Sequence, residues 1–371
     1  MDNGNPSGSI ALTETTLEDD ASKLSREPGS YEFWNFIAYE PGFSIGMIFN
    51  SSDFTNPVHR KAVREHREDP ATNPAPNPAD YPLLQLTVMA GQEKVFFTLK
   101  NPAEATTEFA VTQAYGRIGE STFRGTIEEG VKIYRIHIDC PDMDGKNRLE
   151  ADIEMRALSP GFTVAGDGIY GRIPGGRSHQ WQHVIGYPTT SGTVRVRDRE
   201  GDLVFQRELS EGGGYCDHLW GDGFLGNVVD AYHCGKLELG PQGSLFYVWL
   251  TPHDRKVAPF GYVYRIPKDD RTASLLEIAE FVTADPTTGG LGLEYFEDLT
   301  MKLEGGGQVN ATLCAPPHDD WWFQIMTSAR FSASIPGDVD VANEPGVWSE
   351  YFSFPQLDHP QYCAVFDKMN E

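Results

Sequence analysis

Residues 212–221 hold the densest group of side chains suited to chemistry, in the order Gly-Gly-Gly-Tyr-Cys-Asp-His-Leu-Trp-Gly. Side chains alternate between the two faces of a strand, so His218 and Trp220 share one face. Tyr215 and Asp217 share the other. An imidazole can give or take a proton near neutral pH, and an indole offers a flat apolar wall. The pattern predicts acid–base chemistry on a hydrophobic molecule, with four candidate catalytic residues: Tyr215, Asp217, His218 and Trp220.

Asp217 and His218 are adjacent, and adjacent residues of a strand point to opposite faces. Asp217 therefore cannot orient His218 through a contact on one face, and we expect Asp217 to be structural. His218 and Trp220 are then expected to face the ligand. The alternative is a buried aromatic strand whose acid and imidazole bond to the neighbouring backbone. The residue types alone leave both interpretations open.

The order of residues 212–221 resembles the Gly-x-Gly-Tyr-x-Asp-His-x-Trp-Gly signature of the carotenoid 1,2-hydratase and AttH-like superfamily. The signature is specific because it combines several uncommon residues in a fixed order. The resemblance implies an all-β fold of two lipocalin-like (calycin) antiparallel β-barrel domains packed together. It also implies a superfamily that includes natural-product Diels–Alderases. We expect the resemblance to cover residues 31–371, although the strong motif is confined to this one stretch.

The resemblance also bears on the reaction. In the hydratases, the Asp-His-x-Trp segment and a downstream Tyr-x-Asp are implicated in protonating an alkene and guiding water. His218 and Trp220 match the first part, but the second has no clear counterpart. The segment that begins at Tyr247 has Trp249 where the acid would stand, and the segment that ends at Tyr232 has the reverse order, Asp-x-Tyr. Without that acid, alkene hydration is in doubt.

We therefore favour a cofactor-free cyclase or isomerase of Diels–Alder type that acts on a hydrophobic polyene, polyketide or isoprenoid intermediate of natural-product biosynthesis. Such an enzyme positions its substrate and polarises a carbonyl by hydrogen bonds, and needs no strong acid. The alternative is a hydratase that adds water to an alkene of a carotenoid-like or isoprenoid substrate. A third hypothesis is a non-enzymatic carrier of an apolar metabolite.

Further aromatic and acidic side chains are candidates for lining the pocket. A single tryptophan is more often core than ligand contact, but a calycin-like barrel usually keeps some of its aromatic residues facing a cavity. The segment 346–351 resembles the final Glu-bearing strand of the family, where an apolar environment would raise the pKa of the glutamic acid and a nearby cation would make it structural. The predicted substrate-binding residues are Trp34, Glu32, Trp181, Tyr232, Tyr247, Trp249, Trp348 and Glu350.

Short strand-like segments separated by turn residues recur along the chain, which is the pattern of all-β barrels. We expect a disordered arm at residues 1–29, an N-terminal lipocalin-like domain at 30–186 and a C-terminal one at 187–371. The best junction is Gly186-Tyr187-Pro188. Two segments are expected to be helical: 57–67, which is highly charged, and 274–281, where apolar residues recur.

Several motif matches lack the context that their chemistry needs. The Gly-x-Gly-x-x-Gly match at residues 166–171 is followed by Pro-Gly-Gly, where no helix can start. The Gly-x-Ser-x-Gly match at 42–46 opens the second strand of a hairpin and is no nucleophile elbow. The cysteines and histidines at 216, 218, 233 and 234 fit no zinc spacing. We therefore expect no cofactor and no metal.

The amino-acid composition limits the classes of partner that we expect. The chain has 371 residues and a net charge of −24, which disfavours nucleic acid and anionic membranes. Its five cysteines imply no disulfide framework, and its first twenty residues lack the pattern of a secretory signal. No apolar run is long enough to span a membrane. We expect a cytoplasmic protein that binds a hydrophobic small molecule. The sequence does not define the oligomeric state, and a monomer is the favoured expectation.

Overall fold

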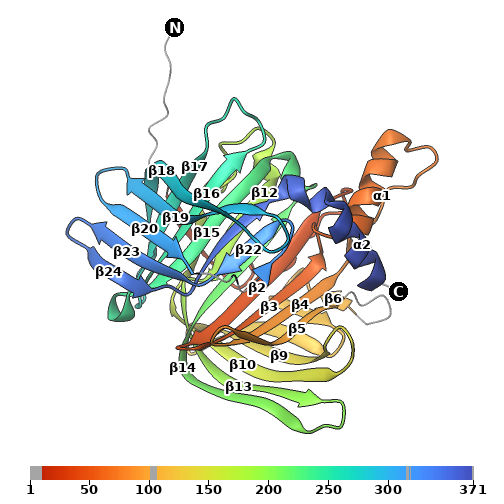
Figure 1. Ribbon diagram of the computed structural model, residues 1–371, viewed down its shortest axis with the longest axis horizontal. Helices are drawn as coiled ribbons and strands as arrows, with labels where there is room; N and C mark the ends of the chain where they lie inside the picture. Colours follow the sequence, from red (N-terminus) through yellow and green to blue (C-terminus); the bar gives the residue numbers. More distant parts are fainter. Residues whose placement is uncertain (1–10, 101–106, 315–316, 318, 370–371) are drawn as a thin grey trace.

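The computed structural model describes residues 11–100, 107–314, 317 and 319–369. These residues are mostly strands, arranged in two curled antiparallel sheets that form half-barrels (Figure 1). The all-β fold class predicted from the sequence is confirmed. No helix of the described residues is long and apolar enough to cross a membrane.

The first sheet takes its strands from the N-terminal part of the chain, in the spatial order β5-β4-β3-β2-β14-β13-β10-β9-β8-β7-β6. Three further strands, β12, β11 and β1, branch from β14. The strands of this sheet are β1 (Leu12–Thr15), β2 (Tyr31–Glu40), β3 (Phe43–Ser52), β4 (Leu83–Ala90), β5 (Glu93–Lys100), β6 (Thr107–Phe109), β7 (Tyr115–Ile118), β8 (Ser121–Glu128), β9 (Val131–Pro141), β10 (Asn147–Ser159), β11 (Gly161–Val164), β12 (His179–Ile185), β13 (Tyr187–Asp198) and β14 (Leu203–Gly221).

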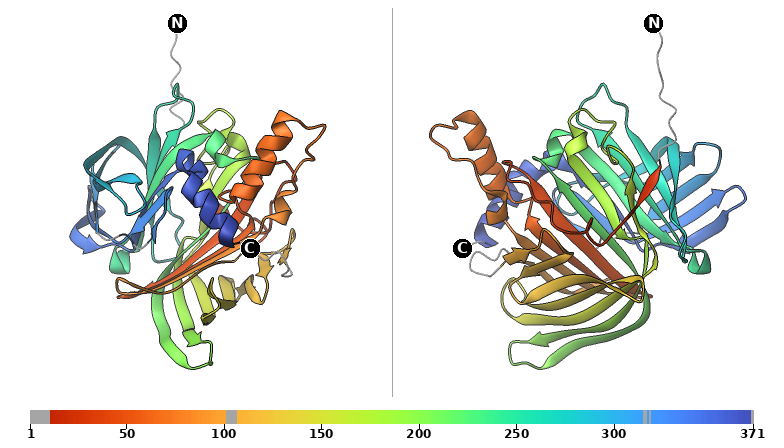
Figure 2. Two further views of the ribbon diagram at one scale, coloured as in Figure 1. Left: turned by 45° about the vertical axis from the view of Figure 1, so that its right-hand side comes forward. Right: turned by 180° about the vertical axis from the view of Figure 1, so that it is seen from behind.

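The second sheet has the spatial order β21-β22-β25-β15-β16-β17-β18-β19-β20-β23-β24. Its strands are β15 (Val229–Glu238), β16 (Ser244–Pro252), β17 (Phe260–Ile266), β18 (Ser274–Thr288), β19 (Glu294–Leu303), β20 (Gln308–Leu313), β21 (Asp319–Asp320), β22 (Gln324–Thr327), β23 (Ala329–Ile335), β24 (Val339–Pro345) and β25 (Trp348–Ser353). Helices α1 (Pro57–Glu68) and α2 (Pro360–Met369) lie at the same end of the molecule (Figure 2). Short 3₁₀ helices are η1 (Pro78–Asp80), η2 (Gly176–Ser178), η3 (Leu225–Asn227), η4 (Gly240–Gln242) and η5 (Phe354–Asp358).

The chain changes sheet later than the expected junction near residue 187. β13, which begins at Tyr187, pairs with β10, and β14 pairs with β2, so both strands complete the first sheet. The second sheet begins at Val229. The division into domains at residue 187 remains a prediction, but the segment 212–221 belongs to the sheet of the N-terminal strands.

The segment before β2 differs from the predicted disordered arm. Residues 1–10 lie outside the described residues, whereas β1 pairs with β11 and residues beyond it pack into the first sheet. Asp20 is fully buried and accepts hydrogen bonds from Lys132 Nζ at 2.8 Å and Tyr134 Oη at 2.7 Å. The prediction was wrong for residues 11–29, because an acidic residue that suggested a solvated arm has a buried cationic partner.

One of the two predicted helices is confirmed. Residues 57–68 form α1, and the Asn56 side chain caps it by accepting from the backbone N–H groups of Val58 and His59. The predicted helix at 274–281 is wrong, because this segment is part of β18. Its apolar residues suit either a helix or a strand. Pairing with β17 and with β19 makes the segment a strand.

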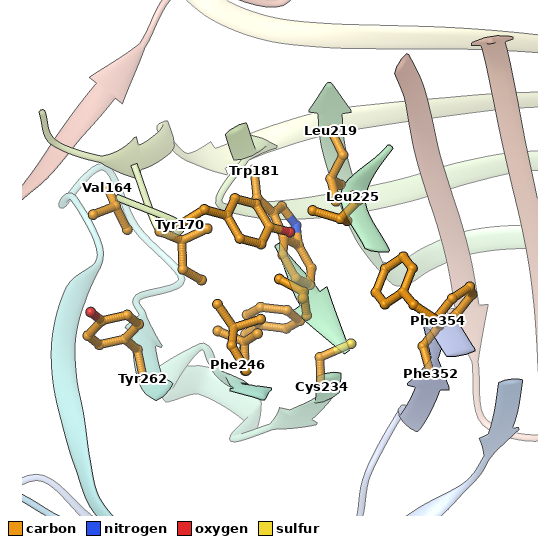
Figure 3. Packing of buried hydrophobic residues seen from close by; sticks show 14 of the residues in the cluster. Val164, Tyr170, Trp181, Leu219, Leu225, Cys234, Phe246, Tyr262, Phe352 and Phe354 are labelled. Atoms are coloured by element: carbon orange, nitrogen blue, oxygen red, sulfur yellow. The ribbon is translucent and has the colours of Figure 1, made fainter. Parts of the chain in front are cut away.

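Three hydrophobic clusters explain how the sheets pack. One lies within the first sheet, one within the second, and the largest lies between them. Figure 3 shows this third cluster, in which Trp181 and Leu219 of the first sheet approach Cys234, Phe246 and Phe352 of the second. The space between the two sheets is therefore lined by both halves of the chain.

A buried ion pair fixes the two sheets against each other at one end of this cluster. Lys236 of β15 is 1% exposed, lies 3.2 Å from Glu238 Oε1 and donates to the carbonyl of Gly214 on β14. Glu238 in turn accepts from the hydroxyl groups of Tyr39 and Tyr187 (2.6 Å for Tyr187). Groups of the first sheet satisfy this pair of the second sheet, so separating the sheets would leave the buried Lys236 without one of its acceptors.

Candidate active site

Pairing of strands brings a row of side chains to one face of the first sheet. Asp217 on β14 lies directly opposite Asn35 on β2, and Asn35 lies opposite Ile48 on β3. The row continues to Gln85 on β4 and Leu99 on β5. Because paired residues project to the same face, these five side chains form one wall, and all of them line the same pocket.

The opposite wall comes from the second sheet. Glu350 on β25 pairs with Cys234 on β15 and with Met326 on β22. One pleat further along, Tyr232 and Gln324 line the wall as well. The pocket therefore lies between the two sheets, and we refer to it as the interface pocket. Aromatic side chains from both sheets and from α2 close its sides: Phe33, Phe54, Trp181, Trp321, Phe323, Trp348, Phe352 and Tyr362.

The interface pocket continues along the same face of the first sheet as an elongated cleft. The neighbouring hollow shares Asn35, Ile48 and Gln85 with it on one side, and Met326 and Trp348 on the other. The two hollows therefore adjoin along this face of the first sheet.

Asp217 is the polar centre of the interface pocket. Its side chain is 2% exposed, and its Oδ2 accepts hydrogen bonds from Tyr215 Oη at 2.6 Å and from Trp181 Nε1 at 2.9 Å. Its Oδ1 forms no hydrogen bond with the described residues. Burial raises the pKa of Asp217 to about 8, and the charge of Glu350 adds to that rise. The hydrogen bonds from Tyr215 and Trp181 oppose it, as does a weaker one from the backbone N–H of Asn35.

These contacts define the chemistry that Asp217 can do. At neutral pH its carboxyl group is largely protonated. Both side-chain donors meet Oδ2, so Oδ1 is the oxygen that can carry the proton of the neutral acid. The group is therefore a neutral acid held in one orientation, able to donate a hydrogen bond or a proton to a bound molecule.

Glu350 is the second carboxyl group of the interface pocket. It is 8% exposed and accepts hydrogen bonds from Tyr232 Oη at 2.8 Å and from Gln324 Nε2 at 3.0 Å. Burial and the charge of Glu350 raise the pKa of Tyr232 and of the Cys234 thiol well above their usual ranges. Both groups therefore stay protonated, and the Tyr232 hydroxyl remains a donor to the carboxylate.

His218 lies on the other face of β14, inside the first sheet. It is fully buried, its Nε2 is 2.9 Å from Glu32 Oε1, and its ring stacks on Trp34 with the centroids 4.2 Å apart. Trp220 is partly exposed on the same face, with its ring centroid 4.6 Å from that of His218. The faces are thus the reverse of our expectation: Asp217 faces the cavity, and His218 faces the core.

The other predicted substrate-binding residues divide between the cavity and the core. Trp181, Tyr232, Trp348 and Glu350 line the interface pocket, whereas Trp34 and Glu32 lie with His218. Two more lie on the far face of the second sheet: the Tyr247 hydroxyl is 2.6 Å from Ser349 Oγ, and Trp249 stacks on Phe281 with the centroids 4.9 Å apart. The structure thus brings together six of the predicted site residues: Trp181, Tyr215, Asp217, Tyr232, Trp348 and Glu350.

Sequence reasoning missed Asn35, Asp53, Gln85 and Gln324 on the walls of the interface pocket. Asn35 carried a detectable signal, because it is a lone amide in the aromatic run Phe-Trp-Asn-Phe and alternates with Trp34. The others depend on which strands pair, which the local sequence does not specify. Within the described residues, no cluster of three or more His, Cys, Asp or Glu side chains is arranged to hold a metal ion.

Comparison with known proteins supports the fold rather than a specific activity. No family model matches the chain, and no curated protein matches its sequence. Among solved structures, an AttH-like protein of Nitrosomonas europaea has a TM-score of 0.55 at 12% identity, covering 87% of this chain and 92% of that one. Kievitone hydratase of Nectria haematococca has a TM-score of 0.52 at 12% identity, covering 94% and 95%. CghA with Sch210972 has a TM-score of 0.52 at 8% identity, covering 92% and 97%. The fold implied by the resemblance of residues 212–221 is confirmed: the chain shares its fold with these three structures.

Proposed function

We propose that the chain is a cofactor-free enzyme that binds a hydrophobic, unsaturated small molecule in the interface pocket and promotes its cyclisation or isomerisation. The observation that carries the proposal is Asp217, a buried acid with a pKa of about 8 whose Oδ1 points to no partner among the described residues. An acid that is neutral at working pH and enclosed by aromatic walls can polarise a carbonyl group of the substrate.

The geometry would act in two ways. The aromatic walls of both sheets restrict a flexible chain to a few conformations, which lowers the entropic part of the barrier to ring closure. Asp217 then donates a hydrogen bond from Oδ1 to the carbonyl that activates the reacting double bond. Tyr215 and Trp181 hold Oδ2, so the donor keeps its direction when negative charge develops on that carbonyl.

Hydration of an alkene is the second candidate, and Glu350 is the observation that favours it. Hydration needs an acid to protonate one alkene carbon and a base to take a proton from the attacking water. Asp217 and Glu350 stand on opposite walls of one pocket and can divide these roles. These two carboxyl groups could replace the downstream Tyr-x-Asp that the sequence lacks, and the fold is shared with kievitone hydratase.

The experiment that tests the proposal is mass spectrometry of the apolar extract of the host, incubated with and without the protein in water labelled with ¹⁸O. Conversion to a product of identical mass, without label, supports the cyclase or isomerase. A gain of one labelled water supports the hydratase. A metabolite that stays bound and unchanged would contradict both enzymes and leave the carrier.

The variant Asp217→Asn separates the two chemical roles of Asp217. An amide still donates a hydrogen bond but cannot transfer a proton. The variant should keep part of the activity if the acid polarises a carbonyl, and lose it if the acid protonates an alkene. Glu350→Gln is the matched change on the opposite wall, and only hydration requires a base there.

A further inference from the structure

A cationic groove lies against helix α1, in a chain whose net charge is −24. Arg60, Arg64 and Arg67 recur at a spacing that turns them to one side of the helix, and all three line the groove. Among the described lining residues, Asp358 of η5 carries the only carboxyl group; its Oδ1 is 3.1 Å from Arg60 Nη1 and 3.0 Å from Arg64 Nη1. We call this hollow the α1 groove.

Two buried nitrogen atoms of the α1 groove have unused hydrogen-bonding capacity. His59 is 1% exposed and Arg60 is 7% exposed, and both line the groove. His59 Nε2 and Arg60 Nε form no hydrogen bond with the described residues. Burying a polar nitrogen without a partner is costly, so such atoms indicate that a partner is supplied from outside the chain.

An anionic oxygen group is the ligand that fits these atoms. Guanidinium groups present several N–H donors in a fixed plane and bind carboxylates and phosphates through paired hydrogen bonds. Three arginine side chains line the groove, and its single carboxylate, Asp358, pairs with Arg60 and Arg64, so positive charge is in excess among the lining residues. Burial lowers the pKa of His59 to about 4, and a hydrogen bond to the backbone of Asp53 partly opposes that fall, so the ring is neutral and the donors for an anion are the guanidinium groups.

The α1 groove adjoins the interface pocket. Phe54 lines both hollows, which therefore meet at this side chain. Its neighbour Asp53 lines the interface pocket; burial raises the pKa of Asp53 to about 6, and the hydrogen bonds from Thr55 and the charge of Arg60 partly oppose that rise. The guanidinium of Arg60 is thus close enough to act on groups inside the interface pocket.

We propose that the α1 groove binds the anionic end of the substrate, a carboxylate or phosphate group, while the apolar body of the same molecule occupies the interface pocket. The substrate class is then an amphiphilic acid with an extended unsaturated chain. The part of this inference that concerns a reacting molecule rests on the proposed function. The preference for an anionic head group does not, because it can be measured without turnover.

The experiment compares two fluorescent polyene probes, cis-parinaric acid and its methyl ester, which share the chain and differ in charge. We expect the wild-type chain to bind the acid about tenfold more tightly than the ester. The double variant Arg64→Gln/Arg67→Gln should lose about that factor for the acid and keep its affinity for the ester. Equal affinity of the wild type for acid and ester would overturn the proposal, as would equal weakening of both probes in the variant.

The control variant Arg124→Gln/Arg271→Gln removes the same amount of charge outside helix α1 and should leave both affinities unchanged. If it weakens the acid as much as the groove variant does, the effect is one of net charge and the proposal fails. Displacement of the acid by dodecanoate or by dodecyl phosphate identifies which anion the groove prefers, and displacement by neither contradicts the proposal. A preference for the acid without any conversion of host metabolites would retain the anion site and refute the enzyme.

Discussion

The two faces of β14 carry two buried carboxyl groups in contrasting states. On the face toward the first core, Glu32 has four partners: its Oε1 meets His218 and the backbone N–H of Lys23, and its Oε2 accepts from Ser22 at 2.6 Å and Ser51 at 2.7 Å. On the face toward the second sheet, Asp217 has two donors on one oxygen and none on the other among the described residues.

This contrast separates a structural acid from a chemical one. A fully bonded buried carboxylate stabilises the fold, and any change to it leaves several donors unsatisfied. A buried acid on the wall of a pocket, with one oxygen lacking a side-chain partner, retains capacity for a ligand at some expense of stability. We therefore expect Glu32 variants to lose stability and Asp217 variants to lose function.

The largest expected effect is on stability, from Glu32→Ala. The change leaves Ser22, Ser51 and His218 without their common partner in a site that excludes water. We expect the free energy of unfolding to fall by about 3 kcal/mol or more. Urea denaturation followed by tryptophan fluorescence measures it. Asp217→Asn is the matched control, and an equally large loss in that variant would remove the distinction between the two faces.

The next effect is on activity, from Asp217→Asn. The amide has the same shape, so binding of the substrate should change by less than about twofold. The rate should fall about tenfold if Asp217 only polarises the substrate, and about a hundredfold or more if it transfers a proton. The conversion identified by mass spectrometry is followed under single-turnover conditions. A variant with the full rate would show that Asp217 takes no part in the reaction.

The sequence predicts the alternation of this strand correctly but not which face meets the second sheet. Period-two alternation separates Asp217 and Tyr215 from His218 and Trp220, as the structure has them. The structure places His218 in the core of the first sheet and not on the wall of the interface pocket, which alternation could not predict because both faces of β14 are buried. The face that becomes a pocket is decided by the approach of β25, whose Glu350 comes from a distant part of the chain.

Other parts of the fold were predictable to different degrees. The capped helix α1 has local signals, which is why residues 57–67 could be identified. Ser274–Thr288 has an apolar pattern that suits helix or strand, and its two partner strands decide in favour of strand. The buried position of Asp20 depends on Lys132, more than a hundred residues away, and no local pattern predicts such a pair.

The pH dependence of stability sharpens the comparison further. The pKa of Asp217 rises from 3.8 to about 8 on folding, chiefly because burial disfavours the charged form. Its contribution to stability is therefore fully present below about pH 4 and is lost as the pH rises through 8. Asp217→Asn cannot ionise, so it should gain stability relative to the wild type over this range, by up to about 1.4 kcal/mol per pH unit.

Denaturation of both proteins at several values between pH 5 and 9 tests this expectation. The difference between two proteins cancels the contributions of groups that they share, including Asp53, whose pKa is also raised by burial, to about 6. A difference that does not vary with pH would mean that Asp217 is ionised in the folded state, and the proposed acid would be lost.

The smallest effect distinguishes two buried tyrosines. Tyr215→Phe removes one of the hydrogen bonds that lower the pKa of Asp217, so that pKa should rise further, by about half a unit to one unit. Infrared difference spectra against Asp217→Asn report protonation of this carboxyl group without a substrate.

Tyr247→Phe is the matched control for Tyr215→Phe: it removes a buried hydroxyl that bonds Ser349 on the far face of the second sheet. It should lower the free energy of unfolding by about 1 kcal/mol and leave the titration of Asp217 in place. If the two variants move that titration equally, the shift arises from general loosening of the fold, and Tyr215 does not hold the acid.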